Sequence, residues 1–266
     1  MLLGLHHVTA LAGDPQANLD YYTQVLGLRL VKRTVNFDDP GSYHFYFGDP
    51  DGRPGTLLTF FTGFHRQMRR GAGQAVSVTY GQPQPTGTNP DPDGLDLQLA
   101  EGASPALRSV SLCERELEPT GAFLELLGFK HVSTEGNRHR FELAAAQIEV
   151  LHEPEAERSK LGAGAIHHIA FRVADEATQL DWRDRLMNAG LRVSPVKDRL
   201  YFHSIYFREP GGVLFEIATD GPGFLMDEPA DALGSSLRLP PWLELSRESI
   251  QARLSPIHFS EYSRTL

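Results

Sequence analysis

The hydrophobic pattern of the chain repeats one unit, in which a strand leads into an amphipathic helix and further strands follow. Three segments show the unit clearly, and their first strands are GLHHVTAL from Gly4, ALRSVSLC from Ala106 and AIHHIAFRV from Ala165. The later runs of each segment alternate or are continuously apolar, as is typical of strands. A glycine directly after a helix is typical of a left-handed cap. Helices are therefore predicted to end at three glycines, Gly27, Gly128 and Gly190.

A fourth, shorter copy of the unit is predicted between Ala75 and Gly102. AVSVTY and LDLQLA have the pattern of strands, but the segment between them is rich in Pro, Gly, Thr and Asn and cannot form a helix. A linker between two domains would explain the same composition, and the two interpretations have equal support. The first interpretation gives four tandem copies of a strand–helix–strand–strand–strand module, with the second copy truncated.

These modules predict an α+β fold in which tandem βαβββ units pair into two domains, each built on a curved sheet. The predicted boundaries are 1–102 for an N-terminal domain with modules 1 and 2, and 103–222 for a C-terminal domain with modules 3 and 4. Residues 223–266 follow as a tail. A short helix is expected there at Leu243–Leu254, because Pro240 and Pro241 precede it.

Composition and charge narrow the class of protein. A net charge of -9 gives no basic surface for nucleic acid or anionic membranes. The single cysteine, Cys113, excludes an intrachain disulfide and a thiolate zinc cluster. No apolar run reaches the length of a transmembrane helix, and the first residues lack the pattern of a signal peptide. The expectation is a soluble, cytoplasmic protein.

Polar residues interrupt the predicted strands at equivalent places in the modules. The first strand carries His6-His7 in the first module and His167-His168 in the last, and the last strand carries Thr59 in the first module and Glu216 in the last. Burying such side chains in an apolar strand is costly unless they have a partner. If the first and last modules lie side by side, His7, His168 and Glu216 can converge.

Strand alternation indicates which histidine of each pair faces a cavity, because successive side chains point to opposite faces. His168 shares its face with Ala170 and Arg172, whereas His167 shares the opposite face with large apolar residues. The same argument favours His7 and Glu216. Two imidazoles and one carboxylate match the ligand set of non-haem Fe(II), although Mn(II) and Zn(II) fit the same donors. Hydrogen-bonded core histidines are the alternative, and the recurrence of the pair in register with a glutamate favours the metal.

The motifs resemble the vicinal-oxygen-chelate superfamily, also called the glyoxalase/bleomycin-resistance/dioxygenase group. They are GLHHVTAL, YYTQVLGLRLVKRTVNFDDPGSYHFYFGD, GTLLTFF, GAGAIHHIAFRV, DRLYFHSIYFREPGGVLFEIATDGPGF and LPPWLE. Within that superfamily they are most similar to the ring-cleaving hydroquinone dioxygenases, the dichlorohydroquinone dioxygenase-like and MhqO-like branch. The resemblance covers nearly the whole chain. It departs from the family in the shortened second module.

The resemblance implies an Fe(II)-dependent, extradiol-type dioxygenase that inserts O2 into a hydroquinone- or catechol-like ring. It implies that His7, His168 and Glu216 hold the iron, with His6 and His167 beside them as candidate acid/base groups. Thr9, Arg199 and Tyr206 match positions that line the substrate pocket in that branch, and Arg199 and Tyr206 are expected to hold the substrate oxygen. His203, in the same segment as Tyr206, is a further candidate for substrate binding. The expected partners are a small aromatic molecule and O2, and the sequence leaves a homo-oligomer open.

Two other functions compete with the dioxygenase. A glyoxalase-I-like isomerase shares the fold, but such sites generally use a fourth protein ligand on the first module, where this chain has Thr59. A metal-free binding or resistance module would lack the ligand set altogether. The predicted triad therefore favours the dioxygenase over both.

Overall fold

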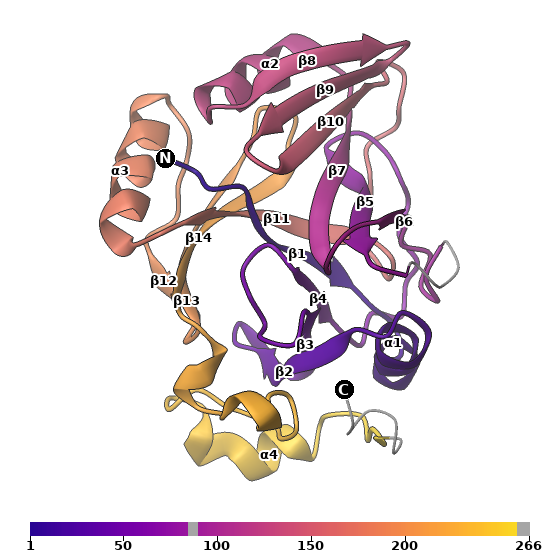
Figure 1. Ribbon diagram of the computed structural model, residues 1–266, viewed down its shortest axis with the longest axis vertical. Helices are drawn as coiled ribbons and strands as arrows, with labels where there is room; N and C mark the ends of the chain where they lie inside the picture. Colours follow the sequence, from indigo (N-terminus) through magenta and orange to yellow (C-terminus); the bar gives the residue numbers. More distant parts are fainter. Residues whose placement is uncertain (85–89, 260–266) are drawn as a thin grey trace.

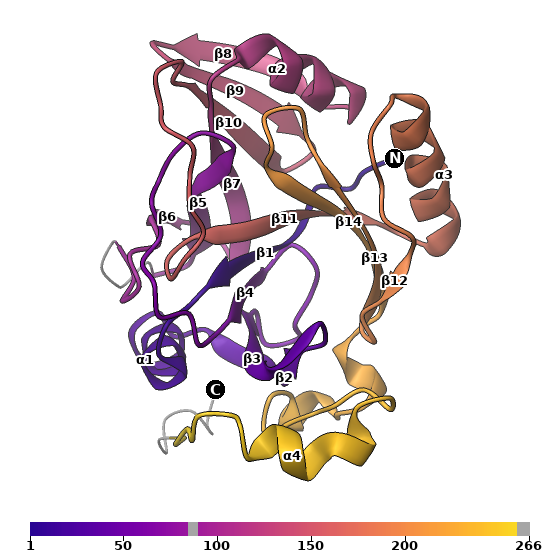
Figure 2. The same cartoon turned by 180° about the vertical axis from the view of Figure 1, so that it is seen from behind.

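The first and last modules build one curved sheet in the computed structural model, which describes residues 1–84 and 90–259 (Figures 1 and 2). In order across the sheet, its strands are β12 (Lys197–Asp198), β13 (Phe202–Arg208), β14 (Leu214–Pro222), β11 (Ile166–Val173), β1 (Leu5–Leu11), β4 (Leu57–Phe61), β3 (Asp39–Gly48) and β2 (Arg29–Asn36). Strands β1 and β11 are antiparallel neighbours, with Val8 opposite Ile169. The two histidine-bearing strands therefore lie side by side in the middle of the sheet, as the repeat predicts.

The two middle modules build a second sheet. In order, its strands are β6 (Leu97–Glu101), β5 (Gln74–Gln82), β7 (Ala106–Glu114), β10 (Ala146–His152), β9 (Arg138–Leu143) and β8 (Lys130–Glu135). In the truncated module, the described residues between β5 and β6 contain no helix. Each sheet takes strands from both sides of residue 102, so the division of the chain into domains at that residue stays a prediction.

Helices follow the first strand of the other three modules. They are α1 (Pro15–Asp20) with the π-helical turn η1 (Tyr21–Val25), α2 (Leu117–Leu126) and α3 (Glu176–Asn188). Asp14 and Asp175 cap α1 and α3 by accepting a hydrogen bond from a backbone N–H of the first turn. The three predicted terminal glycines, Gly27, Gly128 and Gly190, have φ of 68°, 97° and 88°, the left-handed conformation that glycine adopts without strain. The helix ends are confirmed.

The core lies between the two sheets. Val8 and Ile169 of the eight-stranded sheet belong to the same buried cluster as Val78 and Val110 of the six-stranded sheet. Because side chains alternate along a strand, the residues between these apolar positions face the other side of the eight-stranded sheet. The α+β fold of paired modules is confirmed, and the concave face of the larger sheet is left for polar residues. None of the described helices has the length and apolar character needed to cross a membrane.

The tail crosses the outer strand β2 of the first module, at the bottom of Figure 1. It forms the short turns η2 (Phe224–Met226), η3 (Ala230–Ala232) and η4 (Glu244–Ser246) and the helix α4 (Arg247–Gln251). Lys32 of β2 is fully buried, and its ammonium group donates to Asp227 at 2.7 Å and to the buried Glu228. A buried charge is stable only with such partners, so this pair ties the tail to the first module.

Candidate metal centre

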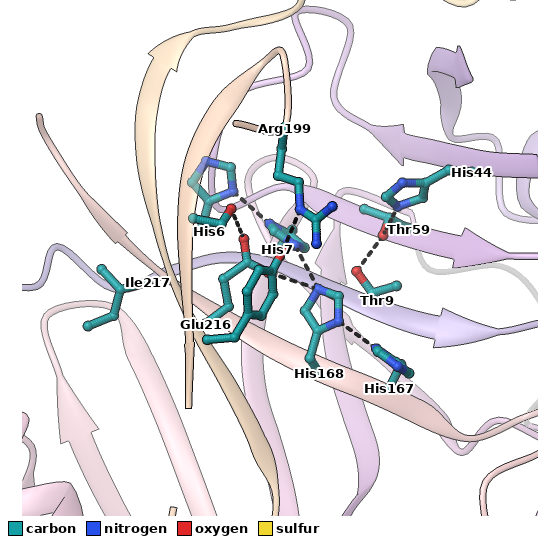
Figure 3. A network of polar contacts seen from close by, with 12 residues as sticks. His6, His7, Thr9, His44, Thr59, His167, His168, Arg199, Glu216 and Ile217 are labelled. Carbon is teal, nitrogen blue, oxygen red and sulfur yellow. Dashed lines mark hydrogen bonds and ion pairs between the residues drawn. The ribbon is translucent and has the colours of Figure 1, made fainter. Parts of the chain in front are cut away.

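Three side chains from three adjacent strands meet on the concave face of the larger sheet: His7 of β1, His168 of β11 and Glu216 of β14 (Figure 3). Their ligand-type atoms all lie within 4.8 Å of one another, and all three side chains are buried. The Nε2 atoms of the two histidines are 3.1 Å apart. The Oε2 atom of Glu216 lies 3.0 Å from Nε2 of His168 and 3.5 Å from Nε2 of His7. The structure thus brings together the three predicted ligands.

A chain of hydrogen bonds fixes the tautomer of His7. The Nε2 atom of His6 lies 3.2 Å from the carbonyl oxygen of Thr219, and a carbonyl can only accept, so this nitrogen carries the hydrogen. In a neutral His6 the Nδ1 atom is then an acceptor, and it lies 2.9 Å from Nδ1 of His7. His7 must therefore donate through Nδ1. In a neutral His7 the Nε2 atom is left with its lone pair toward Glu216, the form that binds a metal.

His6 is neutral because burial and the neighbouring His7 lower the pKa of His6 to about 3. The other pair repeats the arrangement: Nδ1 of His167 lies 2.8 Å from Nδ1 of His168. Burial and the charge of His168 lower the pKa of His167, again to about 3. In each pair, the first histidine therefore contacts the Nδ1 atom of the second while staying uncharged itself.

One carboxylate oxygen of Glu216 accepts a hydrogen bond, and the other accepts none from the part of the chain that the structure describes. Ser204 of β13 donates to Oε1 at 2.5 Å. No group among the described residues donates a hydrogen bond to Oε2, although this oxygen is fully buried. Burial alone would raise the pKa of Glu216, but the two imidazoles hold it well below its usual range, so the group is ionised. A buried anionic oxygen beside two imidazole nitrogens is a site that a divalent cation fits.

His7 and His168 line a cavity of about 440 Å³ that takes its walls from both halves of the larger sheet, and Glu216 is fully buried beside them. Arg199 and Tyr206 line it, and Nε of Arg199 donates to the Tyr206 hydroxyl oxygen at 3.1 Å. Burial and the charge of Glu216 raise the pKa of Tyr206, so this hydroxyl keeps its hydrogen. Arg199 also donates to Asp38 of the first module at 2.8 Å. Donors for a substrate oxygen therefore stand beside the three ligand atoms.

The structure does not bring every predicted site residue to the cavity. His203 lies on the opposite face of β13, because alternation separates it from Ser204 and Tyr206, and its ring contacts Glu176 at 2.8 Å. His6 is buried behind His7, and Thr9 is fully buried; neither lines the cavity, whereas His167 does.

The sequence reasoning missed two residues that line the cavity from β3, His44 and Tyr46. Neither His44 nor Tyr46 is among the site residues predicted from the sequence. The signal was available, because His44 and Tyr46 lie two residues apart on one strand face, as Ser204 and Tyr206 do on β13. The pocket is thus lined by equivalent positions of two modules.

Paired βαβββ modules that hold a His, His, Glu group on the concave face of a shared sheet define a vicinal-oxygen-chelate protein. The chain belongs to the Glyoxalase/Bleomycin resistance protein/Dioxygenase superfamily, whose sequence model matches residues 4–82 and 109–217. The family resemblance predicted from the motifs is confirmed.

Three relatives by sequence carry the names of dioxygenases. MhqO of Bacillus subtilis, provisionally named a ring-cleaving dioxygenase, is 38% identical, with 97% of this chain and 98% of the relative covered. MhqE of the same organism, provisionally named in the same way, is 40% identical over 93% of this chain and 96% of its own length. The chlorohydroquinone/hydroquinone 1,2-dioxygenase of Sphingobium indicum is 33% identical over 91% of this chain and 92% of its own length. The prediction of an enzyme of this class agrees with these names.

Solved structures show the same architecture. The crystal structure of a provisionally named dioxygenase from Bacillus subtilis has a TM-score of 0.89 and 37% identity, and the match covers 98% of this chain and 99% of the other. Glyoxalase I of Zea mays has a TM-score of 0.61 and 16% identity, with 82% of this chain and 92% of the other covered. The second likeness shows the shared fold alone.

Proposed function

We propose that the protein is an Fe(II)-dependent, extradiol-type dioxygenase that opens a hydroquinone- or catechol-like ring, with His7, His168 and Glu216 as the metal ligands. The observation that carries the proposal is the buried Oε2 atom of Glu216, which has no hydrogen-bond donor among the described residues and faces two imidazole Nε2 atoms. Two nitrogens and one oxygen leave coordination positions for a substrate and O2, as in non-haem iron oxygenases. Mn(II) and Zn(II) are the competing metals, because donor type alone does not select iron.

When bound, the metal supplies Lewis acidity toward an aromatic hydroxyl and the redox chemistry that O2 requires. The protein's own groups bind and orient the ring. The Tyr206 hydroxyl and the Arg199 guanidinium present donors to a substrate oxygen that gains negative charge. Asp38 holds Arg199 from the first module, so both halves of the sheet position this donor.

His167 is our candidate for the cavity group that donates a hydrogen bond to the substrate beside the metal. It lines the cavity, and its Nδ1 atom faces Nδ1 of His168. If His168 binds the metal through Nε2, its Nδ1 hydrogen is donated to His167. The Nε2 atom of a neutral His167 then carries a hydrogen that can be donated in a hydrogen bond to a substrate oxygen. His6 has the same place beside His7 but donates to the Thr219 carbonyl, so its role is to orient His7.

Nothing in the site favours the isomerase. The position equivalent to Glu216 in the first module is Thr59, whose hydroxyl is engaged by Thr9 at 2.7 Å and His44 at 3.0 Å. At the position equivalent to Glu216, the first module thus has no carboxylate to serve as a fourth protein ligand. The likeness to glyoxalase I is limited to the fold.

The test is the metal content of anaerobically purified protein, followed by O2 uptake with hydroquinone and with catechol. We expect about one iron per chain, loss of that iron in His168→Ala, and O2 uptake that depends on the metal. His152→Ala is the matched control, since His152 lies on β10 of the other sheet. Tight metal without O2 uptake on either diol would favour the isomerase. Absence of metal from the wild-type protein would refute the ligand set.

A further inference from the structure

The two halves of the larger sheet differ at one pair of equivalent positions. In the last module, Glu216 of β14 lies opposite Tyr206 of β13. In the first module, Thr59 of β4 lies opposite Tyr46 of β3 in the same register. A threonine cannot replace the carboxylate as an anionic ligand, so this half of the site must serve another purpose.

That half carries a continuous chain of hydrogen bonds. The hydroxyls of Thr9 and Thr59 are 2.7 Å apart, Nε2 of His44 lies 3.0 Å from Oγ1 of Thr59, and the Tyr46 hydroxyl lies 3.0 Å from Nδ1 of His44. Figure 3 shows the Thr9–Thr59–His44 part of this chain beside the three ligand residues. All four side chains are buried. A buried polar chain of this kind is maintained only if each member finds its partners.

Tyr46 is the member of the chain that can take a further partner inside the cavity. Both ring nitrogens of His44 are engaged, and the Thr59 hydroxyl already has two partners. A tyrosine hydroxyl can donate once and also accept, so Tyr46 retains one of these capacities after bonding to His44. Thr9 also has capacity left, but Thr9 does not line the cavity and Tyr46 does.

The direction of the hydrogen bonds along this chain decides whether Tyr46 donates a hydrogen bond to a molecule in the cavity or accepts one from it. Burial and the nearby His7 and His168 hold the pKa of His44 well below its usual value, so its ring is neutral with one donor and one acceptor nitrogen. If Nε2 of His44 donates to Thr59, Nδ1 accepts from Tyr46, and the Tyr46 oxygen is free to accept. If Thr59 donates to His44, Nδ1 donates to Tyr46, and Tyr46 turns its hydrogen toward the cavity. Both directions leave the chain uncharged.

An aromatic residue, Phe61, lines the cavity between His44 and His167. The His44 ring lies 4.3 Å from the Phe61 ring, measured between centroids, and the Phe61 ring lies 5.7 Å from that of His167. A flat ring against Phe61 would have one edge at the ligands and the other toward β3. A substrate with oxygen at both edges needs a polar partner at each.

We propose that Tyr46 binds the second oxygen substituent of the aromatic substrate, and that His44 and Thr59 set whether Tyr46 accepts from that oxygen or donates to it. This inference rests on the proposed ring-cleaving function and deepens it by assigning a substrate with oxygen atoms at two edges of the ring. Tyr46 can accept a hydrogen bond from a hydroxyl substituent in one direction of the chain, and in the other direction it can donate one to a carbonyl. His44 is a positioning residue, because it acts through Tyr46.

The first experiment measures binding by calorimetry, without O2, of hydroquinone and of phenol to the iron-loaded protein. Phenol keeps one hydroxyl and lacks the second. Tyr46→Phe is expected to weaken hydroquinone binding about three- to tenfold, the value of one lost hydrogen bond, and to leave phenol binding unchanged. Tyr43→Phe is the matched control, since Tyr43 lies on the same strand with its hydroxyl bonded to the Ser255 carbonyl of the tail.

A second variant tests whether His44 acts by positioning Tyr46 or whether the substitutions damage the site in general. His44→Phe should weaken hydroquinone binding to the same extent as Tyr46→Phe, and the double variant should show no further loss, because both changes remove one contact. Additive losses, or equal losses for phenol and hydroquinone, would overturn the inference.

The same data separate this inference from the proposed function. O2 uptake with hydroquinone combined with unchanged binding in Tyr46→Phe would refute the role of Tyr46 alone. The expected binding differences without O2 uptake would refute the dioxygenase and keep the role of Tyr46. A wild-type protein that binds neither compound would refute both.

Discussion

A buried carboxyl pair between the two sheets gives the sharpest prediction about stability. Glu114 ends β7 of the six-stranded sheet, and Glu209 lies in the turn between β13 and β14 of the other. Glu209 accepts hydrogen bonds from Thr120 at 2.8 Å and from the backbone of Gly211 and Val213 at 2.9 Å. Glu114 is 1% exposed, and its Oε1 atom has no partner among the described residues. Hydrogen-bond donors therefore stabilise the anionic form of Glu209, whereas the Oε1 atom of Glu114 has no such donor among the residues that the structure describes.

Burial, then the charge of Glu209 and a hydrogen bond with it, raise the pKa of Glu114 from 4.5 to about 8. A raised folded-state pKa contributes stability that is fully present below 4.5 and is lost as the pH rises through 8. Between these two pKa values, each rise of one pH unit lowers the free energy of unfolding by about 1.4 kcal/mol. At pH 7 the folded protein has therefore lost roughly 3 kcal/mol relative to a variant with a neutral side chain of the same shape.

Glu114→Gln should recover most of this loss, because its amide can donate to Glu209 without a proton from solvent. We expect an increase of about 2–3 kcal/mol in the free energy of unfolding at pH 7, a shift of roughly 1 M in the urea midpoint. The gain should grow from pH 5 to pH 8. Glu116→Gln, at an exposed position two residues away, is the control. A variant that is less stable than wild type by the same amount at every pH would refute the reasoning.

Three further predictions concern the metal site, the tail and acid stability. Ser204→Ala removes the donor to the carboxylate ligand and should weaken metal binding 10–100-fold in a chelator competition. Lys32→Met leaves the buried Glu228 with only the more distant Arg238, at 3.5 Å, and should cost about 3 kcal/mol in urea unfolding, most of it recovered when Glu228→Gln is added. His6 and His167, with folded pKa values of about 3 against 6.5, contribute stability that is present above pH 6.5 and lost as the pH falls; metal-free protein should lose up to about 4 kcal/mol in urea unfolding between pH 7 and 5.

Each of these has a result that would contradict it. Unchanged metal affinity in Ser204→Ala would mean that the hydrogen bond to the carboxylate does not orient it. A Lys32→Met variant as stable as wild type would show that the tail is held by apolar contacts alone. For acid stability, His167→Gln should reduce the loss between pH 7 and 5 by about 2 kcal/mol, whereas substitution of the exposed His131 should not; equal losses would exclude the buried histidines as the cause.

The convergence of His7, His168 and Glu216 could be predicted because the signal for it is local and repeated. Strand alternation has a period of two, so the small or polar companions of His168 identified the face it occupies. The repeat then identified His7 as its equivalent. The pairing of β1 with β11 confirmed that the first and last modules are neighbours.

The surroundings of the site could not be predicted in the same way, because they depend on pairings across the sheet. His203 was included for its nearness in sequence to Tyr206, yet an odd separation along β13 places the two on opposite faces. The role of His44 depends on the register of β3 against β4, which brings Tyr46 opposite Thr59. Glu114 and Glu209 meet only because the two sheets pack together, which no local pattern indicates.

The pairing of β1 with β11 also sets the order in which the chain can fold during its synthesis. The strands of the six-stranded sheet follow one another between Gln74 and His152 and can pair soon after they leave the ribosome. Strand β1 ends at Leu11 but must wait for β11 to begin at Ile166. At about 5–20 residues per second, this interval lasts roughly 8–30 s. His7 is thus among the earliest residues made, while the half of the sheet that carries His168 and Glu216 is among the last.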